Sequence, residues 1–286
     1  MTDVAVTAAQ IGRWRGHIGR AETRRQILDP ESLRRYAVAV GAPAEVERVL
    51  PPLAHWAWFL DAVEAEELSE DGHAKRGGLV PPITLPRRMF AAVAFRFHRP
   101  LILGEPAELT IGVADVRHRQ GRAGDLVFVD LDRRLHQRDE ERLTERQTIV
   151  YRALGERVPP IVPVATAATR GEIWTPGPVE LFRFSAATFN AHRIHYDLPY
   201  AREVEGYPGL VVHGPLTAAR LFAHARARTP GVIAGFAVRI TAPLFADQPI
   251  RLGGGEAGEW HAMRCDGVVA VTARIEVAGG DHGDGA

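Results

Sequence analysis

Two histidines in the second half of the sequence are the side chains best suited to chemistry. His192 and His195 lie three positions apart in FSAATFNAHRIHYDLPYA, residues 184–201, with the polar Asn190 and Asp197 on either side. Imidazole changes its protonation near neutral pH, so such a pair can move protons to and from a substrate. Histidines at the end of a helix can equally be structural or exposed. The cluster therefore indicates acid–base chemistry, with a structural role as the alternative.

Neither a metal nor a nucleotide cofactor is indicated. A histidine pair with this spacing can ligate zinc, but a catalytic zinc needs a third protein ligand, and the sequence has no HExxH motif. The segment GGGEAGEW, which begins at Gly253, lacks the Lys-Ser/Thr of a phosphate loop and is not followed by a predicted helix. We therefore expect no metal and no other cofactor.

The elements that must position the histidines follow from breakers and apolar patterns. Asp29 is a good N-cap, Pro30 suits the first helical turn and Gly41 suits the stop, so a helix is expected over 29–41. Runs rich in Val, Ile, Leu and Thr between glycines predict successive antiparallel strands. The expected strands of the first half are 90–99, 108–116, 126–135 and 145–153. The second half has helical stretches around 184–189 and over 215–227, and strands at 233–240, 250–254 and 268–277.

A proline-rich segment separates two units of similar size. Residues 156–172 hold three prolines and no helical period, which is typical of a linker. We therefore expect one domain over 1–155, a second over 173–278, and a disordered tail over 279–286. A strand followed by Pro-Leu and a short loop occurs in both units, which suggests duplication of one α+β unit, although chance similarity can produce the same pattern. The two segments are 95–105 and 238–247.

Composition excludes several classes of function. Lys plus Arg equals Asp plus Glu at 35 each, so the basic excess of a nucleic-acid-binding protein is absent. The sequence has one cysteine, Cys265, and therefore no internal disulfide. It has no run of 18 apolar residues and no secretory signal at its start. We expect a cytoplasmic protein with neither a nucleic-acid nor a membrane partner.

The histidine segment resembles the hydratase motif of the MaoC-like, hot-dog-fold family. In this comparison His195 matches the motif histidine and Asp197 the acidic residue that follows it. Asn190 lies where the family has its catalytic aspartate, His192 lies at the motif asparagine, and Arg193 lies at the motif proline. The central histidine is thus kept, and the second acid–base residue is not.

The resemblance extends over roughly residues 20–278. EGYPGLVVHGPLTAARLF is similar to the family's loop and central helix, whereas EDGHAKRGGLVPPITLPRRMFA and RLTERQTIVYRAL resemble a subgroup. That subgroup holds mesaconyl-C4-CoA hydratases, itaconyl-CoA hydratases and fungal-type 3-hydroxyacyl-thioester dehydratases. The resemblance implies an α+β double hot-dog fold, with two antiparallel sheets that each wrap a central helix. The second unit would be catalytic, and the first would shape the acyl pocket.

The implied activity is that of a hydro-lyase adding water reversibly to an enoyl-CoA thioester. The expected substrate is mesaconyl-C4-CoA or itaconyl-CoA, with citramalyl-CoA as product. His195 would activate the water, and N–H groups at the helix start after His213 and Gly214 would stabilise the enolate. The alternatives are a 3-hydroxyacyl-thioester dehydratase, a thioesterase, and a non-catalytic acyl-CoA-binding or partner subunit. A homo-oligomer is possible.

The remaining candidate residues concern the second proton transfer and a substrate carboxylate. Asn190 cannot act as a base but can orient water, and Asp197 either assists His195 or caps a helix. His192 is a candidate binding residue. Arg193, Arg87 and Arg88 are candidates for a carboxylate of the substrate, with pairing to protein carboxylates or to CoA phosphates as the alternative. Asp71-Gly72-His73 belongs to the subgroup phrase, and a turn is expected there, with a loop histidine that reaches the site as the alternative.

Overall fold

All the strands that the structure describes form one antiparallel sheet. The computed structural model describes residues 5–121, 124–164 and 171–279. The sheet has ten strands, and every pair of neighbours is antiparallel. The strands are β1 (Ala21–Ile27), β2 (Arg87–Phe97), β3 (Pro106–Gly121), β4 (Gly124–Gln137), β5 (Glu140–Arg152), β6 (Glu172–Trp174), β7 (Ile233–Ile240), β8 (Ile250–Gly254), β9 (Glu259–Met263) and β10 (Val269–Val277).

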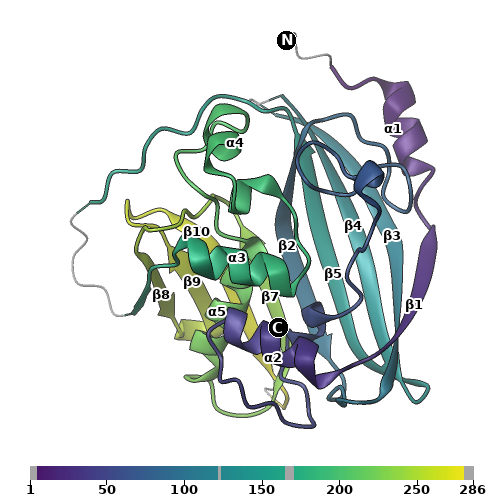
Figure 1. The fold of residues 1–286 in the computed structure, drawn as a ribbon, viewed down its shortest axis with the longest axis vertical. Coiled ribbons are helices and arrows are strands. Elements are labelled where there is room, and N and C mark those ends of the chain that lie inside the picture. Colours follow the sequence, from purple (N-terminus) through teal and green to yellow (C-terminus); the bar gives the residue numbers. More distant parts are fainter. Residues whose placement is uncertain (1–4, 122–123, 165–170, 280–286) are drawn as a thin grey trace, which may run out of the picture.

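The strand order repeats once within the sheet. It runs β1-β3-β4-β5-β2 from one edge to the centre and β6-β8-β9-β10-β7 from the other edge. The two halves meet where β2 pairs with β7, with Phe95 opposite Phe236 (Figure 1). The two segments of the suggested repeat begin on these two central strands, so the sheet order supports a duplicated unit.

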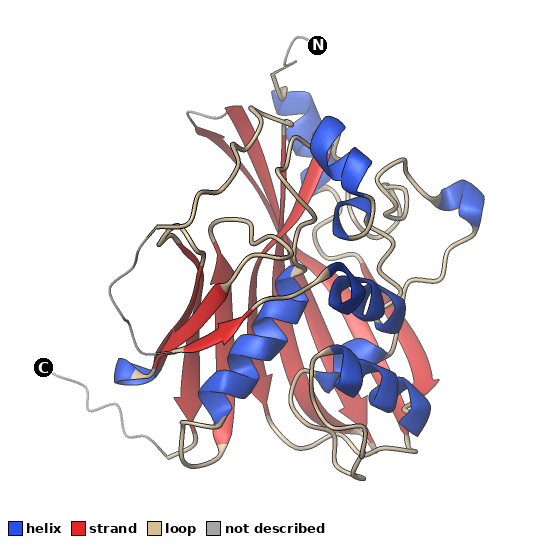
Figure 2. Ribbon diagram, turned by 60° about the vertical axis from the view of Figure 1, so that its left-hand side comes forward, coloured by secondary structure: helices blue, strands red, loops and turns tan. Residues whose placement is uncertain are grey.

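One long helix lies across the strands of the second unit. This helix, α5 (Gly214–Arg226), is fully buried at positions such as Leu216 and Leu221 (Figure 2). The first unit has no counterpart of α5 among the described residues, because its helix α2 (Pro30–Ala39) packs mainly against α3 (Pro178–Ala187) and the 3-10 turn η1 (Ala54–Ala57). This corrects the expectation of a central helix in each of two separate sheets. The other helices are α1 (Ala8–Arg15), α4 (Leu198–Glu203), η2 (Ala65–Glu67), η3 (Arg193–His195) and η4 (Glu256–Gly258).

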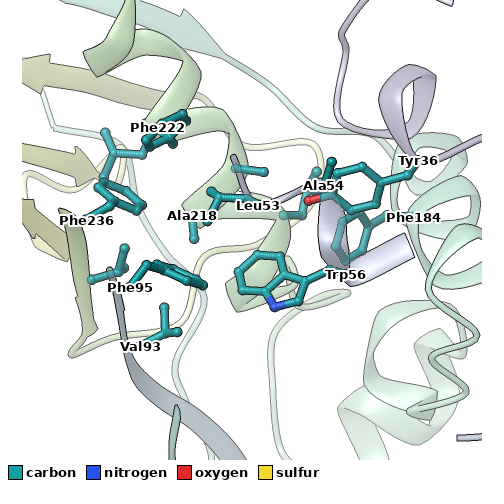
Figure 3. Close-up of a cluster of buried hydrophobic side chains, with 14 of the residues drawn as sticks. Tyr36, Leu53, Ala54, Trp56, Val93, Phe95, Phe184, Ala218, Phe222 and Phe236 are labelled. Atoms are coloured by element: carbon teal, nitrogen blue, oxygen red, sulfur yellow. The ribbon is translucent and has the colours of Figure 1, made fainter. Parts of the chain in front are cut away.

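A shared aromatic core joins the two units. The ring of Phe95 on β2 is 5.5 Å from that of Trp56 in η1 and 6.3 Å from that of Phe236 on β7, measured between centroids. Phe222 of α5 packs on Phe236 at 5.0 Å, and Phe184 of α3 belongs to the same cluster (Figure 3). Because apolar burial is the main force that holds a fold together, this cluster fixes the loops of the first unit against the helices of the second.

The predicted linker is attached to the second unit. The N–H of Val158 donates to Gly206 O at 2.8 Å, and the N–H of Val164 donates to Cys265 O at 3.0 Å. Strand β6 begins at Glu172, inside the expected linker. Residues 165–170 of the linker and 280–286 of the predicted tail lie outside the described residues. The domain boundaries remain predictions.

Candidate active site

The histidine motif follows the end of helix α3. The helix ends at Ala187, and the N–H of Asn190 donates to Ser185 O at 2.8 Å. The side-chain oxygen of Asn190 then accepts the N–H of His192 at 3.0 Å. Such an Asx turn fixes the backbone that leads into η3. Asn190 lines the cavity described below, but its oxygen is already engaged in positioning the motif.

His195 presents one nitrogen as an acceptor. Its Nδ1 lies 2.7 Å from Val211 O, and a carbonyl only accepts, so Nδ1 carries the hydrogen and donates. Nε2 is therefore the basic nitrogen. The residue is 7% exposed, and burial lowers its pKa to about 4. His195 is thus neutral at pH 7 and can accept a proton.

The ring of His213 packs against the ring of His195. The two rings are stacked, with centroids 3.6 Å apart and planes at 22°. His213 Nε2 lies 2.8 Å from Ser185 Oγ, and its Nδ1 has no partner among the described residues. His213 is fully buried and does not line the cavity. Burial and the two neighbouring histidines hold its pKa well below the usual value. The predicted contact of His213 with substrate is therefore replaced by a packing role.

A loop of the first unit reaches the same place. His73 Nδ1 lies 3.0 Å from Asp71 Oδ2, and the backbone N–H of His73 donates to Asp71 Oδ1 at 3.0 Å. The ring of His73 is 4.2 Å from that of His192, and the ring of His192 is 5.3 Å from that of His195. With His213, four imidazoles from two units form one row. The expected turn at 71–73 is thus also part of the site.

The protonation states of Asp71, His73 and His192 depend on burial and on one another. Burial alone would raise the pKa of Asp71, but its hydrogen bonds to His73 outweigh burial and hold that pKa well below the usual range. Burial and the nearby Arg88 lower the pKa of His73, and Asp71 partly offsets them. Burial and the adjacent histidines hold the pKa of His192 well below its usual value. The resting cluster is one carboxylate with neutral imidazoles.

The histidines open into one large cavity. Its volume is about 750 Å³, which is within the range for small-molecule sites. His73, His192 and His195 lie on its wall together with Arg88. The apolar part of the lining comes from both units and includes Leu68, Phe90, Phe182, Phe189, Ile240 and Leu244. A cavity of this kind can hold an acyl chain with one polar, proton-transferring end.

Gly214 lies where helix α5 begins at the cavity wall. A Cβ at this position would lie 2.6 Å from Ile240 Cδ1 and 3.0 Å from Phe90 Cδ1, so only glycine fits without displacement. Pro215 follows in the first turn of the helix, where its missing N–H leaves no helical hydrogen bond unmade. The first turn of a helix has N–H groups without helical partners, and its dipole favours negative charge. This geometry suits the predicted enolate site.

The candidate arginines have different surroundings. Arg88 lines the cavity and has no carboxylate partner among the described residues. Arg87 is buried, and its Nε donates to Glu205 Oε2 at 2.9 Å. Arg193 pairs with Asp197 at 2.8 Å, and neither residue lines the cavity. The prediction of a carboxylate-binding arginine is therefore narrowed to Arg88.

Asp197 acts as a helix cap in the structure. Its Oδ1 accepts the N–H of Tyr200 at 3.1 Å at the start of α4. Together with the ion pair to Arg193, this engages both carboxylate oxygens. The structure favours the structural alternative for Asp197, because both of its carboxylate oxygens are engaged and the residue does not line the cavity.

Asp71, His73 and His192 are the described group whose spacing allows a metal ion. One oxygen or nitrogen of each lies within 4.8 Å of the others. Both oxygens of Asp71 already accept hydrogen bonds from His73. The group is therefore satisfied as a hydrogen-bonded Asp71–His73 pair beside a second imidazole, that of His192.

Comparison with known proteins decides the family. The family model "Hydroxyacyl-thioester dehydratase type 2" matches residues 53–246. A mesaconyl-C(4)-CoA hydratase of Chloroflexus aurantiacus is 44% identical over 281 residues, which cover 93% of this chain and 98% of the relative. The chain belongs to the hydroxyacyl-thioester dehydratase type 2 family. The mitochondrial type 2 dehydratase of Schizosaccharomyces pombe is 26% identical, with 73% of this chain and 79% of the relative covered.

Solved structures show the fold. HtdX of Mycobacterium tuberculosis has a TM-score of 0.62 at 18% identity and covers 90% of this chain and 99% of its own. A second M. tuberculosis protein, described as having a double hot-dog fold, has a TM-score of 0.53 at 13% identity, with 92% and 97% covered. The predicted α+β double hot-dog fold and the predicted hydro-lyase family are confirmed. No described helix is long and apolar enough to cross a membrane, and the cytoplasmic location remains a prediction.

Sequence reasoning missed Asp71 as a site residue and gave His73 only as an alternative to a turn residue. The signal for them was the phrase EDGHAKRGG, which matches the subgroup although it lies in the unit expected to have lost its catalytic residues. The structure explains the glycine of this phrase, because a Cβ at Gly72 would come within 1.8 Å of Ala191 O. A glycine that close to the histidine motif marks a contact between the units.

Proposed function

We propose that this protein adds water reversibly to mesaconyl-C4-CoA, an enoyl-CoA with a carboxylate on its β-carbon, to give citramalyl-CoA. The observation that carries the proposal is the shared cavity: the acceptor-bearing imidazole of His195 and the unpaired Arg88 both line it. The 44% identity to a mesaconyl-C4-CoA hydratase over nearly the whole chain supports the same substrate.

Each step of the hydration has a candidate group in the cavity. His195 Nε2 accepts a hydrogen bond from the attacking water and orients it, and the water oxygen bonds to the β-carbon as it loses one proton to a base at the cavity wall. The electron pair of the C=C bond moves toward the thioester, and an enolate forms on the carbonyl oxygen. N–H groups of the first turn of α5, beside Gly214, stabilise that oxygen. A proton delivered to the α-carbon completes the addition, and the reverse sequence removes water.

Arg88 selects for the carboxylate. In mesaconyl-C4-CoA the free carboxylate is attached to the β-carbon, which is the carbon that water attacks. The group that binds this carboxylate must therefore lie close to the catalytic imidazoles. Arg88 lines the same cavity as His73, His192 and His195, and its charge lowers the pKa of both His73 and His192. A guanidinium binds a carboxylate through two parallel hydrogen bonds. Arg88 therefore orients the β-carbon toward the water.

Loss of enoyl-thioester absorbance tests the proposal. The purified protein is mixed with mesaconyl-C4-CoA, and in parallel with crotonyl-CoA, which keeps the methyl group on the β-carbon but has hydrogen in place of the carboxylate. We expect fast loss with mesaconyl-C4-CoA, slower loss with crotonyl-CoA, and neither in His195→Ala. Loss that is equally fast in His195→Ala contradicts the role of His195 in activating the water.

A second candidate is the dehydration of a 3-hydroxyacyl thioester in fatty-acid metabolism. The 26% identity to a fungal type 2 dehydratase and the apolar side chains along the cavity favour it. The same assay separates the two, because this function requires crotonyl-CoA or a longer enoyl-CoA to be the better substrate. The proposed partner is in both cases a CoA or related thioester.

A further inference from the structure

The histidine motif of the second unit lacks one acid–base group. Asn190 lies where the family has an aspartate, and an amide does not take up a proton at neutral pH. Its oxygen is also held by the N–H of His192 at 3.0 Å. Asp197, the other acidic residue of the motif, caps α4 outside the cavity. The motif alone therefore offers His195 without a carboxylate to stabilise its protonated form.

The first unit supplies such a group at the same cavity. His73 lines the cavity, and its Nδ1 lies 3.0 Å from Asp71 Oδ2. Since a carboxylate accepts, Nδ1 carries the hydrogen and Nε2 is the basic nitrogen. A carboxylate in this position stabilises the imidazolium that forms when Nε2 takes a proton. Neither His192 nor His195 has a carboxylate partner among the described residues.

The loop that carries the pair is fixed to the motif. The N–H of Arg193 donates to Asp71 O at 2.9 Å, and Arg193 Nη1 donates to Glu70 O at 3.2 Å. Gly72 packs so closely on Ala191 O that no side chain fits between them. The contact between His73 and His192, 4.2 Å between centroids, completes the junction. A loop needed only as a turn requires none of these contacts with the opposite unit.

We propose that Asp71 and His73, from the first unit, form the second acid–base pair of the active site, in the role that Asn190 cannot fill. This rests on the proposed hydration and divides the roles of the two histidines: His195 holds the attacking water by a hydrogen bond, and His73 takes its proton and returns it. The attacking water donates one hydrogen bond to His195 Nε2 and the other to His73 Nε2. As the oxygen bonds to the β-carbon, one O–H bond breaks and that proton moves to His73 Nε2. The C=C pair becomes the enolate, which takes the proton back from His73 at the α-carbon.

Charges around His73 agree with this division. The side chains that face it are Asp71 and Arg76 of its own loop, Arg88 of β2 and His192 of the motif. Arg88 and Arg76 oppose protonation of His73 in the free enzyme, whereas Asp71 favours it. Of the two arginines, Arg88 lowers the pKa of His73 more. A substrate carboxylate bound at Arg88 neutralises that charge. Substrate binding thereby raises the basicity of His73 when it is needed.

The test compares two conservative variants. His73→Asn keeps a donor for Asp71, because the amide nitrogen replaces Nδ1, and removes Nε2. Asp71→Asn keeps an acceptor for Nδ1 and removes the charge. We expect His73→Asn to lower kcat for mesaconyl-C4-CoA by about 10²- to 10⁴-fold, the usual effect of a general acid–base group, with KM changed by less than about fivefold.

The pH profile separates a catalytic pair from a structural one. His73 must be neutral to accept a proton, so activity rises with pH through its pKa. The charge of Asp71 raises that pKa, and Asp71→Asn is therefore expected to move the acidic limb of kcat/KM to lower pH as well as lower kcat. If Asp71 only held the loop in place, Asp71→Asn would lower the stability of the protein without shifting the acidic limb of kcat/KM. The matched control is His118→Asn, which breaks a 2.7 Å histidine–aspartate pair with Asp125 outside the cavity and should leave both quantities unchanged.

The possible failures are distinct. Full activity and an unshifted profile in folded His73→Asn, with His195→Ala inactive, would overturn the role of His73 and leave the proposed hydratase standing. Activity that EDTA abolishes and a divalent metal restores would also overturn it, since His73 would then serve an ion. Inactivity of the wild-type protein on both mesaconyl-C4-CoA and crotonyl-CoA would refute the proposed function, and the role of His73 with it.

Discussion

Replacement of Arg88 tests how the cavity selects its acyl group. Arg88→Gln keeps a polar side chain of similar length on β2 but removes the charge. A hydrogen bond to a charged group contributes about 1.5–3 kcal/mol, and each 1.36 kcal/mol corresponds to tenfold in rate, so kcat/KM for mesaconyl-C4-CoA should fall by about 10- to 150-fold. Because Arg88 has no carboxylate partner in the described structure, its loss leaves no protein charge unpaired.

Crotonyl-CoA provides the internal comparison. It lacks the carboxylate, so Arg88→Gln should leave its kcat/KM within about threefold and shift the preference between the two substrates. Arg99→Gln is the matched control, since Arg99 is exposed, pairs with Glu140 at 3.5 Å and lies outside the cavity. Equal losses on both substrates would refute the reasoning, because they would show that Arg88 supports the site without reading the acyl group.

Three further predictions concern the site and its support. Gly214→Ala forces a methyl group onto Ile240; it should cost about 1–3 kcal/mol in urea unfolding and lower kcat by about 10²-fold or more by moving the helix start. Burial lowers the pKa of His195 to about 4, so the unfolded chain binds its proton first as pH falls, and stability should decline from about pH 6.5 toward pH 4. In folded His195→Gln the free energy of unfolding should decline less over this pH range, by up to about 3 kcal/mol. A decline equal to that of the wild-type protein would contradict the lowered pKa of His195. Arg87→Ala leaves Glu205 buried without its partner and should cost about 3–5 kcal/mol in the same unfolding assay, a loss that a surface pair would not produce.

The sequence was sufficient where local chemistry dictates structure. The cap at Asp29 accepts the N–H of Ser32 at 2.8 Å, as expected for the predicted helix start. Strands β7 and β8 have the predicted bounds because apolar residues fill them and turns border them. Strand β1 was missed because its segment, AETRRQI, is polar and mostly exposed, so no apolar alternation marks it. The three-residue β6 was missed for want of length, and β9 was missed because its sequence, EWHAM, contains no β-branched residue.

Which residues meet in the site depends on contacts between the two units, and these contacts could not be predicted from the sequence. His195 and the start of α5 were predicted because each lies within a single sequence motif. The pairing of Arg87 with Glu205 was not predictable, because the partners come from different units and the adjacent Arg88 looked equivalent. The sequence left His73 as an alternative for the same reason: only the packing of its loop on the motif brings it to His192.

The most direct test of the central claim is the mass of the product formed from mesaconyl-C4-CoA in ¹⁸O-labelled water. The account predicts an intact CoA thioester heavier by one water, with the label in the hydroxyl on the β-carbon, and no such product from His195→Ala. Release of free CoA with label in a carboxylate would show thioester hydrolysis instead. That result, or unchanged substrate in the wild-type protein, would contradict the assignment of hydration to this site.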